Sequence, residues 1–163
     1  MTPRRVMTLG LLASAAALAF AYLLEFGFGL EPCPLCIFQR VAMAGVALVC
    51  LAGALHGPLG WGRHVYFLLA TASAGVGAAI AGRHVWLQSL PADQVPACGP
   101  DLNYLLDVMP WAEVLAMVLR GDASCADIDA AFMGLSLPAW TLVGFVLLLA
   151  GLLWGWLAAR RAA

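Results

Sequence analysis

The sequence is poor in charge and contains no lysine. Only 10% of its 163 residues are charged, whereas 64% are hydrophobic. A soluble domain averages about 25% charged and roughly 45–50% apolar residues, so this composition excludes an ordinary soluble protein and indicates an integral membrane protein. The chain also lacks low-complexity tracts, internal repeats and an extended polar tail. We therefore expect one compact membrane domain over residues 1–163.

Four apolar segments are long enough to cross a bilayer, which requires about 20 helical residues. They cover approximately residues 6–24, 37–55, 65–82 and 137–157. The predicted fold is an all-α four-helix transmembrane bundle, with external loops at about 25–36 and 88–136. Small residues recur four positions apart, which favours close helix packing. They are Ala13, Ala17 and Ala21 in the first span, and the pairs Gly75/Ala79 and Ala78/Gly82 in the third.

The arginines are divided unequally between the two sides of the predicted bundle. Five lie at the termini or between spans two and three, and three lie on the other side: Arg4, Arg5, Arg63, Arg160 and Arg161 against Arg40, Arg83 and Arg120. The positive-inside rule then places both termini in the cytoplasm. All nine acidic residues fall on the external side, and the six tryptophans fall near the span ends, as in aromatic belts.

The first apolar segment has an alternative interpretation. Because it follows Arg4 and Arg5 and contains many alanines, it resembles a cleaved signal peptide. Its apolar run is longer than the usual 7–15 residues of such a peptide. Cleavage would leave three spans and move the C-terminal arginines outside, against the charge rule. These points favour a retained span.

The second external loop, residues 88–136, is unusually long. It contains four prolines and two separated cysteines, and loops of this length without their own fold are usually functional or mobile. The segment Met109–Glu113, with Pro110 before Trp111, predicts the start of a short helix. The apolar residues that follow predict a helix either lying on the membrane surface, anchored by Trp111, or docked on the bundle. The sequence leaves both arrangements open.

The most informative motif is Cys33-Pro34-Leu35-Cys36, at the start of the second span. A Cys-x-x-Cys pair at a helix start is a redox geometry, because the first N–H groups and the helix dipole favour a thiolate. Arg40 shares this helix face, so its charge would stabilise a thiolate or an anionic acceptor. A dithiol at the membrane edge suggests thiol chemistry coupled to a lipid-soluble compound.

The other cysteines permit several interpretations. Cys98 and Cys125, in the long loop, could exchange disulfides with the first pair. They are 27 positions apart, whereas four-cysteine zinc sites normally use two close pairs, so no metal site is expected. Haem attachment would require a histidine after Cys36, where Ile37 stands. A purely structural role is disfavoured because a Cys33–Cys36 disulfide closes almost no loop and would add little stability. Cys50, deep in the second span, is expected to be a packing residue.

The end of the third span carries a further polar group. His84 and Gln88 are four residues apart and share a helix face at the membrane level of the dithiol, whereas Arg83 points elsewhere. A histidine at that depth could hydrogen-bond or protonate a ligand, although an isolated interfacial histidine is commonly just solvated.

Taken together, these motifs resemble the DsbB family, the disulfide-forming inner-membrane proteins of bacteria. The resemblance covers four spans, the Cys-x-x-Cys-x-x-x-Arg motif at Cys33–Arg40, the two loop cysteines and the basic cytoplasmic ends. It implies a thiol:quinone oxidoreductase of the bacterial inner membrane, with its active cysteines in the periplasm. The implied partners are a DsbA-like thioredoxin-fold oxidase, membrane lipid and a quinone, either ubiquinone or menaquinone. No nucleic-acid partner is expected.

The resemblance also implies a role for each site residue. Cys98 and Cys125 would form the disulfide that accepts electrons from the partner, with Cys98 in the mixed disulfide. Cys125 would then exchange with Cys33, leaving Cys36 facing the quinone. Arg40 matches the family's arginine beside the quinone, and His84 matches the histidine that helps to bind it. Gln88 is a candidate for the same site.

The sequence leaves three alternatives to this function. A DsbI-like paralogue would use the same chemistry with a dedicated partner. Two features of the motif also depart from the family pattern: Pro34 stands in the spacer, and Gln39 stands before Arg40 where an acid is absent. A vitamin K epoxide reductase-like enzyme would carry its Cys-x-x-Cys on a later helix. A non-enzymatic scaffold would use the four outer cysteines only as disulfide staples.

Overall fold

Four long helices dominate the computed structural model, which describes residues 2–57, 60–91, 93–95, 102–121, 123–126 and 131–161. They are α1 (Pro3–Phe28), α2 (Pro34–His56), α3 (Gly62–Gln88) and α7 (Leu137–Arg161), and each is long and apolar enough to span a membrane. The predicted four-helix transmembrane bundle is therefore confirmed. The helices extend beyond the predicted spans because backbone hydrogen bonding continues where the side chains become polar. The last turns of α3, which carry His84 and Gln88, are one such extension.

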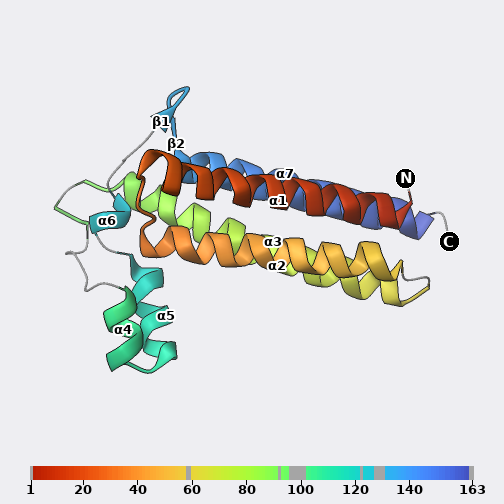
Figure 1. Cartoon of the computed structure of the whole chain (residues 1–163), viewed down its shortest axis with the longest axis horizontal. Helices are drawn as coiled ribbons and strands as arrows, with labels where there is room; N and C mark the ends of the chain where they lie inside the picture. Colours follow the sequence, from red (N-terminus) through yellow and green to blue (C-terminus); the bar gives the residue numbers. More distant parts are fainter. Residues whose placement is uncertain are drawn as a thin grey trace.

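The helices pack side by side with their loops divided between two ends (Figure 1). α2 packs against α1 and α3, and α7 packs against α3 and α1. Both termini and the α2–α3 connection lie at one end. The opposite end carries the short elements α4 (Leu102–Val108), α5 (Trp111–Arg120), α6 (Ala123–Ala126), β1 (Ala131–Phe132) and β2 (Leu135–Ser136). The arginine-rich segments thus share one end of the bundle, and the dithiol lies at the other.

The α1–α2 connection is short because both helices have strong end signals. Gly29 takes a left-handed conformation (φ 69°), and its N–H bonds to the Glu25 carbonyl at 2.9 Å, closing α1. Pro34 occupies the first turn of α2, where its missing N–H costs nothing. Cys33 is the N-cap of α2. The chain therefore reverses direction directly into the Cys-x-x-Cys motif.

Small residues bring the helices together, but most of those that the spacing predicted do not make the contacts, although Ala78 packs against the core. Ala13 and Ala17 are exposed, and a Cβ added to Gly75 or Gly82 would meet nothing within 4 Å. The contacts are instead made by Gly10, which faces the Cys50 thiol, and by Gly77, which lies against the Phe145 ring. Small residues occur on every face of these helices, so a four-residue spacing alone does not identify the packed face. Cys50 is fully buried in this core, as expected of a packing residue.

The long loop folds onto the dithiol end of the bundle. α5 confirms the helix predicted after Pro110, and its Val114 and Val118 are buried in a cluster with Leu35 of α2 and Leu87 of α3. Docking on the bundle is therefore the arrangement found, while Trp111 remains 74% exposed on the other side of α5. The small antiparallel hairpin of β1 and β2 was not predicted, and it adds two very short strands to an otherwise helical chain.

Arg83 attaches α5 to α3. Its guanidinium donates hydrogen bonds to the carbonyls of Leu119 (3.3 Å) and Arg120 (3.0 Å), which end α5, and it lies 4.1 Å from the centre of the Trp86 ring. Terminal carbonyls of a helix lack internal partners and carry its negative dipole end, so a cation is well suited to this position. Arg83 therefore points away from the face of His84, as the spacing predicted.

The packing at Gly77 can be tested by adding one methyl group. In Gly77→Ala the new Cβ would fall inside the van der Waals radius of the Phe145 ring, and overpacking of this kind costs about 1–3 kcal/mol. Thermal unfolding in detergent should show a clear loss of stability. Gly75→Ala, on the same helix with open space around it, is the matched control. Equal stability of the two variants would contradict this packing.

Candidate functional site

The two cysteines of the motif form a close but uncrosslinked pair at the start of α2. The Cys36 N–H donates to the Cys33 sulfur at 3.4 Å, so Cys33 caps the helix with its side chain. The Cys33 thiol in turn donates to the Cys36 sulfur, with 3.1 Å between the sulfurs, whereas a disulfide bond measures about 2.05 Å. Each contact donates a hydrogen bond to a sulfur and so stabilises its thiolate form, as does the positive end of the helix dipole. This is the geometry of a reduced dithiol.

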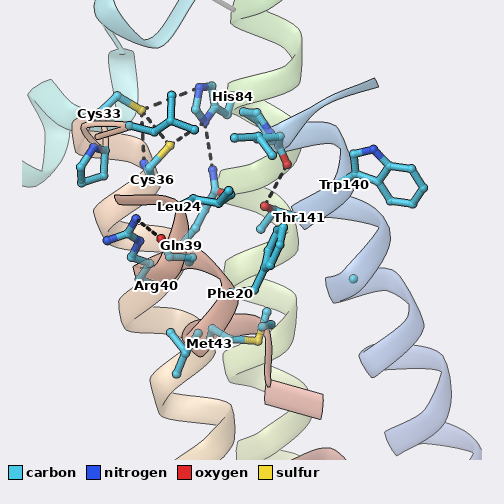
Figure 2. A pocket seen from close by; sticks show the side chains of 18 of the residues that line it. Phe20, Leu24, Cys33, Cys36, Gln39, Arg40, Met43, His84, Trp140 and Thr141 are labelled. Carbon is cyan, nitrogen blue, oxygen red and sulfur yellow. Dashed lines mark hydrogen bonds between the residues drawn. The ribbon is translucent and has the colours of Figure 1, made fainter. Parts of the chain in front are cut away.

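His84 of α3 lies against both sulfurs. Its Nε2 is 3.8 Å from the Cys33 sulfur and its Nδ1 is 3.9 Å from the Cys36 sulfur (Figure 2). The ring is only 2% exposed. It is therefore a buried partner of the dithiol and not a solvated interfacial histidine.

Gln39 orients this imidazole. Its side-chain nitrogen donates to His84 Nδ1 at 3.1 Å, and Gln39 itself is only 4% exposed. When Nδ1 accepts a hydrogen bond, the proton of a neutral imidazole lies on Nε2, which here faces Cys33. Sequence reasoning missed Gln39 as a site residue. Its signal was a polar side chain one turn below Cys36, next to Arg40, on a helix that is largely apolar.

These groups line one cavity of about 260 Å³ among α1, α2, α3 and α7. Its dithiol end carries the polar side chains predicted for the site, since Cys33, Cys36, Arg40, His84 and Gln88 all line it. Its deeper walls are apolar and include Phe20, Leu24 and Met43 (Figure 2). The cavity therefore combines a redox pair and polar groups with a hydrophobic surface, as expected for a flat, lipid-soluble ligand.

Arg40 is held by α1. Its guanidinium forms an ion pair with Glu25, donates to the Ala21 carbonyl at 3.2 Å and lies 5.0 Å from the centre of the Tyr22 ring. The sequence placed no acid next to Arg40, but the fold supplies one from the neighbouring helix. Arg40 therefore acts at the cavity as part of a neutral pair, which is less costly than an isolated charge at the membrane edge.

Gln88 connects the cavity to the last transmembrane helix. The Ser136 hydroxyl donates to its Oε1 at 2.6 Å, directly before α7 begins at Leu137. Gln88 therefore has a structural role at the cavity wall in addition to the ligand contact predicted for it.

Of the two loop cysteines, the structure describes Cys125. Cys125, on α6, is buried in the cluster that contains Leu35 and Leu87, and Cys33 packs against the same cluster. α6 itself packs on α3. The fold thus brings a cysteine from the long loop to the dithiol, as disulfide exchange between the pairs requires. Cys98 lies outside the described residues.

Known proteins resemble this chain over nearly its full length. A family model described as disulfide bond formation protein DsbB matches residues 3–155. Disulfide bond formation protein B of Marinobacter nauticus is 53% identical over 149 residues, covering 91% of this chain and 89% of the relative. The protein of the same name from Chromohalobacter salexigens is 47% identical over 165 residues, covering 99% and 96%. The chain therefore belongs to the DsbB family of disulfide bond formation proteins.

Proposed function

We propose that this protein reoxidises a DsbA-like thioredoxin-fold partner by passing its electrons from Cys98 and Cys125 to Cys33 and Cys36, and from there to a membrane quinone. As a member of the DsbB family, the protein is a disulfide-generating oxidoreductase of the bacterial inner membrane. The observation that carries the residue-level proposal is the convergence of Cys33, Cys36 and His84 at one end of the cavity, with Cys125 in the cluster against which Cys33 packs.

The proposed relay consists of two balanced thiol–disulfide exchanges. A thiolate of the reduced partner attacks the Cys98–Cys125 disulfide at Cys98, and the second partner thiol releases the partner as a disulfide. Cys125 then attacks Cys33 of the Cys33–Cys36 disulfide, and Cys98 resolves the mixed disulfide. Each exchange moves two electrons, and the last one leaves Cys33 and Cys36 reduced. The burial of Cys125 in the cluster that Cys33 packs against supports the second step.

The residues around the cavity fit a quinone headgroup. Such a group is flat and apolar with two carbonyl oxygens, and it accepts two electrons and two protons from a dithiol. The cavity offers apolar walls at Phe20, Leu24 and Met43, and N–H donors at Arg40, His84 and Gln88. These features suit ubiquinone and menaquinone alike.

The chain's own residues prepare the dithiol for this reaction. The start of α2 and the Cys33 thiol stabilise negative charge on Cys36, which is the sulfur proposed to face the quinone. His84 provides an exchangeable ring proton next to both sulfurs, and Gln39 fixes which ring nitrogen carries it.

We also propose the orientation in the membrane. The end that holds both termini and most arginines is cytoplasmic, and the end that holds the dithiol and the long loop is periplasmic. The arginine distribution along the sequence supports this orientation. It places the cysteines in an oxidising compartment where a secreted partner can reach them.

The function can be tested with purified protein, a reduced DsbA-like partner and a ubiquinone analogue, following quinone reduction. We expect reduction that depends on the partner. Its absence would reject the proposed function. Reduction with only one dedicated partner protein, and not with a DsbA-like oxidase, would indicate the DsbI-like alternative.

The same assay tests the cysteines. Cys33→Ser and Cys36→Ser should abolish quinone reduction, because each removes one sulfur of the dithiol that completes the relay. Cys50→Ala should keep nearly full activity, since Cys50 lies in the helix core and does not line the cavity. A folded Cys50→Ala protein without activity would show that Cys50 takes part in the chemistry.

Gln39 should contribute to the rate of dithiol oxidation. Gln39→Leu removes the hydrogen bond to His84, which is worth about 0.5–1.5 kcal/mol, so the turnover rate should fall roughly two- to tenfold. The KM for the partner should not change. Gln39→Glu also removes the amide donor, because an ionised carboxylate can only accept, and should not recover the rate. If Gln39→Leu turns over like the wild type, the orientation of His84 does not depend on this contact.

Arg40 should contribute to binding of the quinone and not to binding of the partner protein. Arg40→Gln leaves Glu25 without its ion pair at the cavity edge, and we expect the KM for the quinone to rise roughly tenfold with the partner KM unchanged. Arg83→Gln is a matched control, because Arg83 lies on the same side but binds α5 and does not line the cavity. The opposite pattern, a change in partner KM alone, would place Arg40 at the docking surface.

A further inference from the structure

The reduced dithiol and His84 form a set of ligands suited to a soft metal ion. The sulfurs of Cys33 and Cys36 and a ring nitrogen of His84 lie within 4.8 Å of one another. Thiolate and imidazole are the ligands that zinc and similar divalent cations prefer, and a Cys-x-x-Cys spacing is common in zinc sites. The sequence predicts no metal site, because Cys98 and Cys125 are 27 positions apart and do not form a second close pair. The third ligand comes from another helix, 48 positions after Cys36.

The distances are close to those of tetrahedral coordination. Bond lengths of about 2.3 Å to sulfur and 2.0–2.1 Å to nitrogen place two sulfurs roughly 3.8 Å apart and a sulfur roughly 3.5 Å from the nitrogen. The structure has 3.1 Å between the sulfurs and 3.8 Å from the Cys33 sulfur to His84 Nε2. The sulfurs would move apart by roughly 0.7 Å, and Cys33 Sγ and Nε2 would approach by roughly 0.3 Å. Cys36 Sγ, which lies 3.9 Å from Nδ1, would turn toward Nε2.

The surroundings of the three ligands also suit a cation. Gln39 already contacts His84 Nδ1, and a half-turn of its amide would present the oxygen to Nδ1–H, freeing the Nε2 lone pair. A metal-bound histidine almost always has such a partner on its other nitrogen. The nearby charge of Arg40 is balanced by Glu25, so the cavity does not repel a cation. The cavity leaves room for a water as fourth ligand.

We propose that the reduced protein binds one zinc-like divalent cation between Cys33 Sγ, Cys36 Sγ and His84 Nε2. Binding transfers no electrons and releases the protons that the two thiols still carry. Oxidation of the pair to a disulfide removes both thiolate ligands, so the site exists only in the reduced state. An ion held there occupies both sulfurs and blocks their oxidation. The site is therefore an inhibitory one, available only between the arrival of electrons and their departure.

Zinc binding can be measured without quinone or partner, so its outcome is independent of the proposed function. Reduced protein in detergent is titrated with Zn²⁺ against a chromogenic chelator, and Cd²⁺ is used in parallel because its thiolate complexes absorb in the ultraviolet. We expect one ion per reduced chain and none at this site in the oxidised chain. His84→Asn should raise the Kd for Zn²⁺ at least about tenfold.

Two further variants locate the ion. Cys50→Ala and Cys98→Ser should bind Zn²⁺ like the wild type, since neither residue belongs to the proposed ligand set. Size-exclusion chromatography and thermal unfolding show that each variant is folded. The proposal is overturned if His84→Asn binds with unchanged affinity, if the oxidised protein binds equally well, or if Cys98→Ser abolishes binding, which would place the ion at the loop cysteines.

Discussion

The close packing of α2 against α3 is the constraint on which the rest of the site depends. A Cβ at Gly45 of α2 would approach the Ser73 hydroxyl to 2.7 Å, so the two helices meet there with almost no side chain between them. Such approach is typical of membrane helices, which gain their association energy from contact and not from exclusion of water. It carries the last turns of α3 up to the start of α2, where His84 meets Cys33 and Cys36. Without this contact the dithiol would have no buried imidazole beside it.

Polar groups at this depth are stable because they satisfy one another. Gln39 bonds to His84, Arg40 pairs with Glu25 and the Ala21 carbonyl, and Gln88 accepts from Ser136. Unsatisfied polar groups are costly near the hydrocarbon region, so these pairs also hold the four helices in register around the cavity. Each pair joins two different segments of the chain, and together the pairs fix the positions of the site's polar side chains.

The long loop is linked to the same site by a second, smaller core. Val114 and Val118 of α5 and Cys125 of α6 pack with Leu35, which lies between the two cysteines of the motif. Arg83 holds the end of α5 next to this cluster. The positions of α5 and α6 and the surroundings of the dithiol are thus linked through Leu35 and Cys33, a contact that the proposed exchange between the two cysteine pairs would use.

The sequence by itself determined the four spans, the two-ended distribution of arginines, the helix after Pro110 and the redox motif, because these depend on hydropathy, charge and helix-end signals that act locally. It also pointed to Arg40 by its helix face and to His84 by its depth, and the family resemblance added an expected role for each. Only the tertiary structure decided which small residues pack, since Gly10 and Gly77 are no different in spacing from Gly75 and Gly82. It also revealed the partners of the site residues, Gln39 for His84 and Glu25 for Arg40. The first contact joins residues 45 positions apart, and the second joins residues 15 positions apart. A helical period carries no information about which neighbouring helix a polar face will meet.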